Sequence, residues 1–254
     1  LFYSMRGGSR RPSSLFTNRL LLGLVNCCFP GACSSRARLQ MADPVVVPPR
    51  EKHTATIIFL HGLGDTGYGW SPVFQSEIRH DHIKYICPHA PVRPVALNCG
   101  MEMPAWFNLF GITPDAEEDD EGIAESTMIV HSIIEAEIRS GIPAERVMLG
   151  GFSMGGALAL YAGITYDKPL AGIIALSSFL VQRTKLPGNH TANKNVHIFM
   201  GHGGQDFLVR LSFAQMTEAF IKAFNPNIRL NVYPKMLHSS CPEVISFFFS
   251  VISK

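Results

Sequence analysis

The segment Arg146 to Tyr161, RVMLGGFSMGGALALY, constrains the fold of this chain more than any other stretch. It passes from a short apolar run, through Gly151-Phe152-Ser153-Met154-Gly155, into an Ala/Leu-rich pattern typical of a helix. The pattern G-x-S-x-G between a strand and a helix is typical of a nucleophile elbow, a strained turn that holds a serine hydroxyl clear of the sheet. Glycines are needed there because strand and helix backbones approach closely. A glycine-rich turn with an incidental serine is the alternative, and the placement between strand and helix favours catalysis.

Apolar runs of strand length alternate with helical patterns along the rest of the chain. The sequence predicts strands at 54–60, 83–87, 170–176, 196–200 and 228–233, and helices at 123–139, 209–224 and 242–253. A β-branched run such as TATIIFL is typical of a strand buried on both faces of a parallel sheet. We therefore expect an α/β fold with a mostly parallel central sheet and helices on both faces.

The first 40 residues differ in composition from the remainder. They contain six arginines and no acidic residue, which leaves 16 Lys and Arg against 20 Asp and Glu, a formal charge of −4, in residues 41–254. Such a segment is typical of a mitochondrial transit peptide, and a secretory signal or a non-native extension are the alternatives. We expect residues 1–40 to be a disordered or targeting leader, 41–53 a linker, and 54–254 one α/β domain. The expected location is the cytoplasm, or the mitochondrion if the leader is a native transit segment.

Composition argues against several other classes of protein. Residues 41–254 carry no basic stripe with interleaved aromatic side chains, so nucleic acid is not an expected partner. No run approaches the roughly 18 apolar residues of a membrane span. Cys87, Cys99 and Cys241 are scattered without a C-x-x-C pair, which indicates reduced thiols in a reducing compartment. In the leader, Cys27-Cys28 lies near basic residues and is a candidate acylation site.

An elbow serine is inert without a base that takes its proton and an acid that orients that base. Asp206 and His238 both fall in loops directly after predicted strands, in the chain order Ser, Asp, His that this topology favours. The carboxyl ends of parallel strands meet at one edge of a sheet, so Ser153, Asp206 and His238 are the predicted catalytic residues. His202, which also follows a strand, is the competing base, and Asp167 is the competing acid.

The glycine-rich loop His61 to Gly67 directly follows the first predicted strand. Its backbone amides suit either a phosphate cradle or half of an oxyanion hole. A phosphate loop would have the pattern G-x-x-x-x-G-K-[ST], and no such lysine follows, so the oxyanion interpretation is preferred. Leu63 in this loop and Met154 after the nucleophile are the predicted amide donors. His61 and Gly62 are expected to shape the loop.

Residues 98–112, NCGMEMPAWFNLFGI, form an apolar stretch without a helical or strand period. It is either a loop packed on the core or an apolar wall of a ligand site, and Trp106 and Phe107 are its candidate ligand-binding residues. The acidic run from Asp115 to Glu121 is interpreted as the solvated beginning of the next helix rather than a metal site. The predicted chemistry requires no metal and no other cofactor.

From about Thr54 to its end, the chain resembles the acyl-protein thioesterase and lysophospholipase family of α/β-hydrolases. The resemblance rests on IFLHGLGDTG, KYICPHAPVRPV, PAWF, GIPAERVMLGGFSMGGALAL, HGGQD and MLHSSCP, in the family's order. It implies hydrolysis of long-chain acyl thioesters on S-acylated (palmitoylated) proteins, without a cofactor. The alternative is a lysophospholipase or carboxylesterase acting on soluble lipid esters. By motif, Ser153, Asp206 and His238 match the family's triad, and Leu63 and Met154 match its oxyanion donors.

Three departures from the family pattern affect the site. Met154 stands where glutamine is common, Phe207 where proline usually follows the acid, and Phe179 where tryptophan is common. The resemblance makes Phe179 a third candidate acyl-binding residue. It implies S-acylated proteins and lysophospholipids as partners and allows transient contact with a membrane surface, while the oligomeric state stays open. A catalytically idle protein that only binds acyl chains is the hypothesis from another class, and the intact set of triad residues argues against it.

Overall fold

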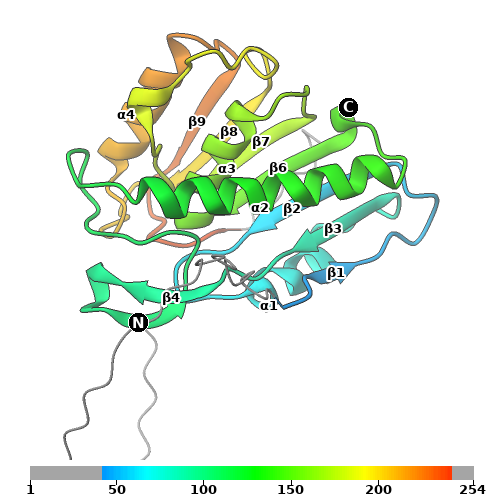
Figure 1. Ribbon diagram of the computed structural model, residues 1–254, viewed down its shortest axis with the longest axis horizontal. Helices are drawn as coiled ribbons and strands as arrows, with labels where there is room; N and C mark the ends of the chain where they lie inside the picture. Colours follow the sequence, from blue (N-terminus) through cyan, green and yellow to red (C-terminus); the bar gives the residue numbers. More distant parts are fainter. Residues whose placement is uncertain (1–41, 242–254) are drawn as a thin grey trace, which may run out of the picture. The chain divides into compact units, whose positions relative to one another are not determined.

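A computed structural model describes residues 42–241, and within that range seven strands form one sheet (Figure 1). These strands are β1 (Val45–Val47), β2 (Ala55–Leu60), β3 (Ile83–Cys87), β6 (Val147–Phe152), β7 (Gly172–Leu176), β8 (Ile198–Gly203) and β9 (Ile228–Tyr233). Their order across the sheet is β1-β3-β2-β6-β7-β8-β9. The β1–β3 pair is antiparallel and every other pair is parallel. The predicted α/β fold with a mostly parallel central sheet is confirmed.

Helices cover the sheet on both faces, because alternate side chains of the buried strands point to opposite sides. The helices are α1 (Gly67–Pro72), α2 (Asp120–Arg139), α3 (Met154–Thr165) and α4 (Leu211–Lys222), and a π-helical turn (Val73–Glu77) follows α1. In β2, Ile58 and Leu60 belong to the core shared with α2, α3 and α4. Ile57 and Phe59 belong to the opposite core, shared with α1 and the π-helical turn. In Figure 1, α2 runs across the front of the sheet.

The first strand differs from the sequence prediction. Residues 41–53 are predicted as a linker, yet Val45–Val47 pair with Cys87, Ile86 and Tyr85 as an antiparallel edge strand. Val47 is almost fully buried, so this short segment is part of the core. The flanking prolines obscure a strand of three residues, because an edge strand tolerates proline beside it. The predicted helix at 242–253 lies outside the described residues.

A two-stranded antiparallel hairpin occupies a stretch that is predicted as irregular. It consists of β4 (Val92–Val95) and β5 (Met101–Pro104), joined through a 3₁₀ turn at Ala96–Asn98. Pro94 and Pro104 hide its strand character in the sequence, since proline cannot donate to a β ladder and is confined to edges. The hairpin delivers the segment that carries Trp106 and Phe107 to the carboxyl edge of the sheet.

Candidate active site

Ser153 occupies a sharp turn between β6 and α3. Its φ of 54° and ψ of −120° lie in a strained region for a residue with a side chain. The turn is held because the Ser153 amide donates to the Leu176 carbonyl at 2.8 Å. A Cβ at Gly151 would lie 2.3 Å from the Gly155 backbone, and one at Gly155 would lie 2.3 Å from the Leu60 carbonyl oxygen. Both glycines are therefore required for strand and helix to approach this closely.

His238 connects Ser153 to Asp206. Its Nε2 lies 3.0 Å from Ser153 Oγ, and its Nδ1 lies 2.8 Å from Asp206 Oδ2. A carboxylate only accepts hydrogen bonds, so Nδ1 carries the proton and Nε2 is left to accept the serine proton. The structure thus brings together the three predicted catalytic residues, from loops after β6, β8 and β9. Their geometry is that of a nucleophile, a general base and an orienting acid.

Asp206 is an ionised group without exposed side-chain surface. Its Oδ1 accepts the Leu208 and Val209 amides at 3.0 and 2.9 Å, and its Oδ2 accepts His238 Nδ1. Burial alone would raise the pKa of Asp206, but the hydrogen bond and charge of His238, with smaller help from the Val209 amide and His202, hold that pKa below its usual value. The carboxylate therefore stays charged, and the imidazole stays oriented, throughout the neutral range.

The two competing residues do not reach Ser153. His202 is fully buried behind Asp206, where its Nε2 lies 2.8 Å from the Val209 carbonyl and 3.6 Å from Asp206 Oδ2. Burial lowers the pKa of His202, so this imidazole is neutral and donates to Val209. Asp167 follows the far end of α3, whose 12 residues span about 18 Å.

The two predicted oxyanion donors follow neighbouring strands of the sheet, β2 and β6, at the carboxyl end of each strand. Met154 is the first residue of α3, where amides have no partner within the helix. Leu63 lies in the loop after β2, and none of the hydrogen bonds within residues 42–241 uses its amide. The next amides of that loop are occupied: Gly64 donates to Pro104 and Asp65 donates to Gly62. Leu63 and Met154 thus retain amides for a ligand oxygen.

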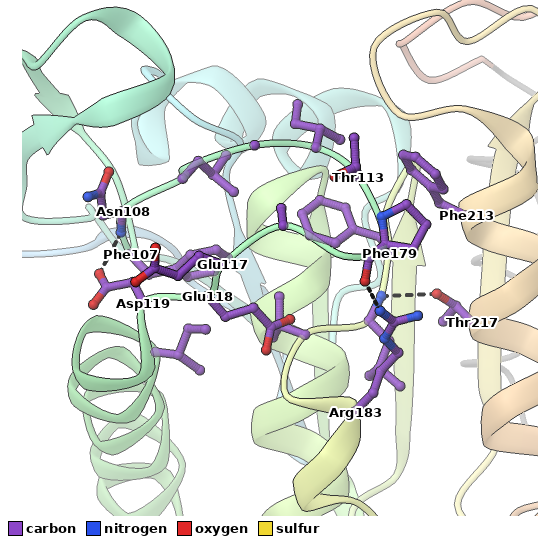
Figure 2. A pocket seen from close by; sticks show the side chains of 18 of the residues that line it. Phe107, Asn108, Thr113, Glu117, Glu118, Asp119, Phe179, Arg183, Phe213 and Thr217 are labelled. Atoms are coloured by element: carbon purple, nitrogen blue, oxygen red, sulfur yellow. Dashed lines mark hydrogen bonds between the residues drawn. The ribbon is translucent and has the colours of Figure 1, made fainter.

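A pocket lined by side chains from residues 107–123, 179–183 and 213–217 holds about 590 Å³ of empty space, including its open mouth; Ser153, Asp206 and His238 are not among its lining residues. Figure 2 shows Phe107, Asn108 and Asp119 on one side of it and Phe179, Phe213 and Thr217 on the other. Phe179 is adjacent to Ser178, whose hydroxyl donates to the Ser153 carbonyl at 2.8 Å. Of the three candidate acyl-binding residues, Phe107 and Phe179 line this pocket.

Trp106, the third candidate, is not part of the pocket wall. Its side chain is fully buried, and its indole N–H donates to the His61 carbonyl at 2.9 Å. The sequence shows that Trp106 is apolar and lies in an irregular stretch, but it gives no sign of a polar contact 45 residues away. Trp106 therefore belongs to the framework around the elbow.

Sequence reasoning missed the contribution of α4 to the pocket, and in the chain after β7 it predicted Phe179 but not Leu180, Val181 or Arg183. Phe213 and Met216 project from α4 onto it, and an amphipathic pattern does not separate pocket-facing from core-facing apolar side chains. The Gln182 amide and side chain donate to Glu118 at 2.8 and 2.9 Å, and its side chain also reaches Asp120. Part of the acidic run predicted as simply solvated thus closes one wall of the pocket.

Other chemistry in the described residues is limited. Residues 42–241 contain no group of three or more His, Cys, Asp or Glu side chains arranged to hold a metal ion. None of the helices in that range is both long and apolar enough to cross a membrane. Burial raises the pKa of the Cys87 thiol to about 12, so this cysteine is unreactive at neutral pH.

Comparison with known proteins gives consistent matches. The family model for phospholipases and carboxylesterases matches residues 41–254. The acyl-protein thioesterase 1 of Neurospora crassa is 44% identical over 218 residues, which cover 82% of this chain and 89% of that protein. The acyl-protein thioesterase 1 of Cryptococcus neoformans var. neoformans serotype D is 41% identical over 217 residues, which cover 78% and 91%.

Solved structures of other proteins share the backbone fold of this chain. Acyl-protein thioesterase 2 of Zea mays superposes with a TM-score of 0.73 at 30% identity, covering 82% of this chain and 98% of that one. SOBER1 of Arabidopsis thaliana gives a TM-score of 0.75 at 29% identity, covering 79% and 98%.

Proposed function

This chain belongs to the phospholipase/carboxylesterase family, and from that premise we propose that it is a serine hydrolase that cleaves long-chain acyl thioesters from S-acylated proteins. The observation that carries the proposal is the continuous hydrogen-bonded line from Ser153 through His238 to Asp206. The similarity to acyl-protein thioesterases supports the substrate class.

The first half of the reaction forms an acyl-enzyme on Ser153. Ser153 Oγ attacks the thioester carbonyl carbon while His238 Nε2, 3.0 Å away, takes the hydroxyl proton. The negative charge that develops on the carbonyl oxygen is received by the amides of Leu63 and Met154. Collapse of the tetrahedral intermediate breaks the carbon–sulfur bond, and the imidazolium supplies the proton for the departing cysteine thiolate. Asp206 stabilises the imidazolium that exists between these two transfers.

The second half regenerates the enzyme with water. His238 takes a proton from a water molecule, whose oxygen attacks the acyl carbon on Ser153, and then returns that proton to Ser153 Oγ as the fatty acid leaves. A thiolate is a good leaving group, so most of the required stabilisation concerns the oxyanion. Apart from the substrate and the attacking water molecule, every group in these steps belongs to the chain itself.

The pocket lined by Phe107 and Phe179 is the proposed site for the acyl chain. Each of these two residues has a sequence neighbour that contacts the elbow. Trp106, before Phe107, donates its amide to Met154 Sδ, and Ser178, before Phe179, donates its hydroxyl to the Ser153 carbonyl. We infer that the acyl chain of an acyl-enzyme on Ser153 extends toward these aromatic and aliphatic side chains. Burial of methylene groups there contributes about 0.8 kcal/mol each.

We also propose two further partners, lysophospholipids and the surface of a membrane. A lysophospholipid presents the same acyl carbonyl on an oxygen leaving group. Transient membrane contact is supported by Val92 and Met101 on the β4–β5 hairpin, whose side chains are largely exposed. The proposed location is the cytoplasm, or the mitochondrion, and cell fractionation tests it.

The substrate class is tested by the ratio of kcat/KM for an S-palmitoylated peptide, a lysophospholipid and a short aryl ester. We expect the thioester to give the highest value and Ser153→Ala to abolish turnover of all three. A higher value for the lysophospholipid would move the assignment to a lysophospholipase. Turnover that survives in the pure Ser153→Ala variant would reject the serine mechanism itself.

A further inference from the structure

We propose that Trp106 is a positioning residue that fixes the two halves of the oxyanion hole relative to each other. This inference rests on the proposed function, because it concerns the Leu63 and Met154 amides of the same site. Trp106 does not contact the substrate in this account. It acts by fixing the backbone of the loop after β2 against the first turn of α3.

The first part of the argument is the attachment of the loop after β2. The Trp106 indole N–H donates to the His61 carbonyl at 2.9 Å. In the opposite direction, the Gly64 amide donates to the Pro104 carbonyl at 2.8 Å. These two hydrogen bonds hold the loop on either side of Leu63. The direction of the Leu63 amide therefore depends on the segment from Pro104 to Trp106.

The second part is the attachment of the same segment to the elbow. The Trp106 backbone amide donates to the Met154 Sδ at 3.4 Å, and the Trp106 carbonyl accepts the hydroxyl of Ser126 in α2. Met154 carries the second proposed oxyanion donor on its own backbone. One residue thus contacts both donor-bearing segments and is itself anchored to a third element.

Burial makes these contacts effective. Trp106 is fully buried, and only 1% of the surface of His61 is exposed. The His61 ring packs 5.2 Å from the Trp106 ring, and its Nε2 accepts the Ala90 amide at 3.0 Å. The His61 carbonyl oxygen also lies close to the elbow, since a Cβ added at Gly155 would be 2.4 Å from it. Loss of the indole N–H leaves that carbonyl unsatisfied and the loop free to shift.

The test is Trp106→Phe, which keeps an aromatic ring but removes the indole donor. We expect kcat for a palmitoyl thioester to fall about tenfold, less than the loss of an oxyanion donor outright, with KM essentially unchanged. A trifluoromethyl ketone places an alkoxide in the oxyanion hole after Ser153 adds to it, so its Ki should rise by the factor by which kcat/KM falls. A non-hydrolysable thioether analogue has no such charge, and its Kd should stay constant.

Two further variants separate positioning from packing. Trp70→Phe removes the chain's other tryptophan, which is also buried but contacts Phe59 and Phe152 in the opposite core. We expect it to lower Tm and to leave kcat intact. Met154→Leu removes the sulfur acceptor and keeps an apolar side chain of similar volume. We expect a smaller loss in kcat that is less than additive with Trp106→Phe, because both changes act on contacts of Trp106.

Equal effects of Trp106→Phe and Trp70→Phe on kcat would overturn the inference, as would a KM and a thioether Kd that rise together with unchanged kcat. If Trp106→Phe does not fold, Met154→Leu becomes the test of the proposal. An unchanged Ki of the trifluoromethyl ketone in that variant would then count against the proposal. Failure of the proposed function is distinguishable, since wild-type protein would then hydrolyse no thioester, and the same comparisons with an aryl ester would still measure the oxyanion hole.

Discussion

At the scale of single residues, Asp206 has the most demanding environment. Its side chain has no exposed surface, yet three hydrogen-bond donors keep it ionised: the Leu208 and Val209 amides and His238 Nδ1. Phe207, at the position where proline is common in the family, is largely exposed, and the next two residues, Leu208 and Val209, both donate their amides to Asp206. The carboxylate fixes the tautomer of His238, and through it the direction in which the serine proton moves.

Asp206→Asn tests this role. The amide presents N–H groups as well as an oxygen, so His238 Nδ1 is no longer required to carry the proton and the imidazole adopts the wrong tautomer. We expect kcat to fall about 10³ to 10⁴-fold with little change in KM. Asp167→Asn, the matched change at the rejected acid, should keep full activity. An Asp206→Asn enzyme with near-normal kcat would remove Asp206 from the mechanism.

At the scale of secondary-structure elements, the elbow depends on how closely β6, β2 and α3 approach. Gly155 lies against the backbone of β2: an added Cβ would be 2.3 Å from the Leu60 carbonyl oxygen. A backbone atom cannot move aside without displacing the strand. The glycines around Ser153 therefore determine the packing of α3 as well as the conformation of the turn.

We expect Gly155→Ala to lower the free energy of unfolding by about 1–3 kcal/mol, or to prevent folding. Gly172→Ala is the control, because its added Cβ would meet the flexible end of Met148 at 3.1 Å. Urea unfolding of both variants measures the difference. Equal stability of the two would show that α3 can move away from β2 at little cost.

The elements also show what a sequence can and cannot predict. The buried parallel strands were predictable, because runs such as TATIIFL combine β-branched residues with strand length. The elbow was also predictable, because glycines at these positions indicate a close approach of strand and helix. β1 and the β4–β5 hairpin were not, since short edge strands carry prolines and too few apolar residues for a period. Trp106 shows the limit for the site: its apolar character suggested a ligand wall, while its hydrogen bonds depend on chain segments that only the fold brings together.

At the scale of the whole molecule, buried histidines connect stability to pH. Burial lowers the pKa of His61, His131 and His202 below the usual value near 6.5, although backbone carbonyls oppose the shift. The unfolded chain binds these protons below about pH 6.5, whereas the native state does not. Unfolding therefore takes up protons, and the free energy of unfolding falls as the pH drops below about 6.5.

We expect the slope of that decrease to become shallower in His131→Gln by at most about 1.4 kcal/mol per pH unit. Glutamine can still donate to the Ala162 carbonyl, which His131 Nε2 contacts at 2.8 Å, but it does not titrate. Denaturant unfolding measured between about pH 5 and 7.5, a range that brackets the usual histidine pKa, gives the slope. Parallel curves for wild type and variant would show that His131 titrates alike in both states.

The central claim is that Ser153 carries the acyl group during hydrolysis. The direct measurement is mass spectrometry of the peptide containing Ser153 after the enzyme is mixed with a palmitoyl thioester and quenched in acid within one turnover. The account predicts a palmitoyl ester on Ser153 that forms at the rate of thiol release and is absent from Ser153→Ala. Thioester hydrolysis at the normal rate without acylation of Ser153 would contradict it.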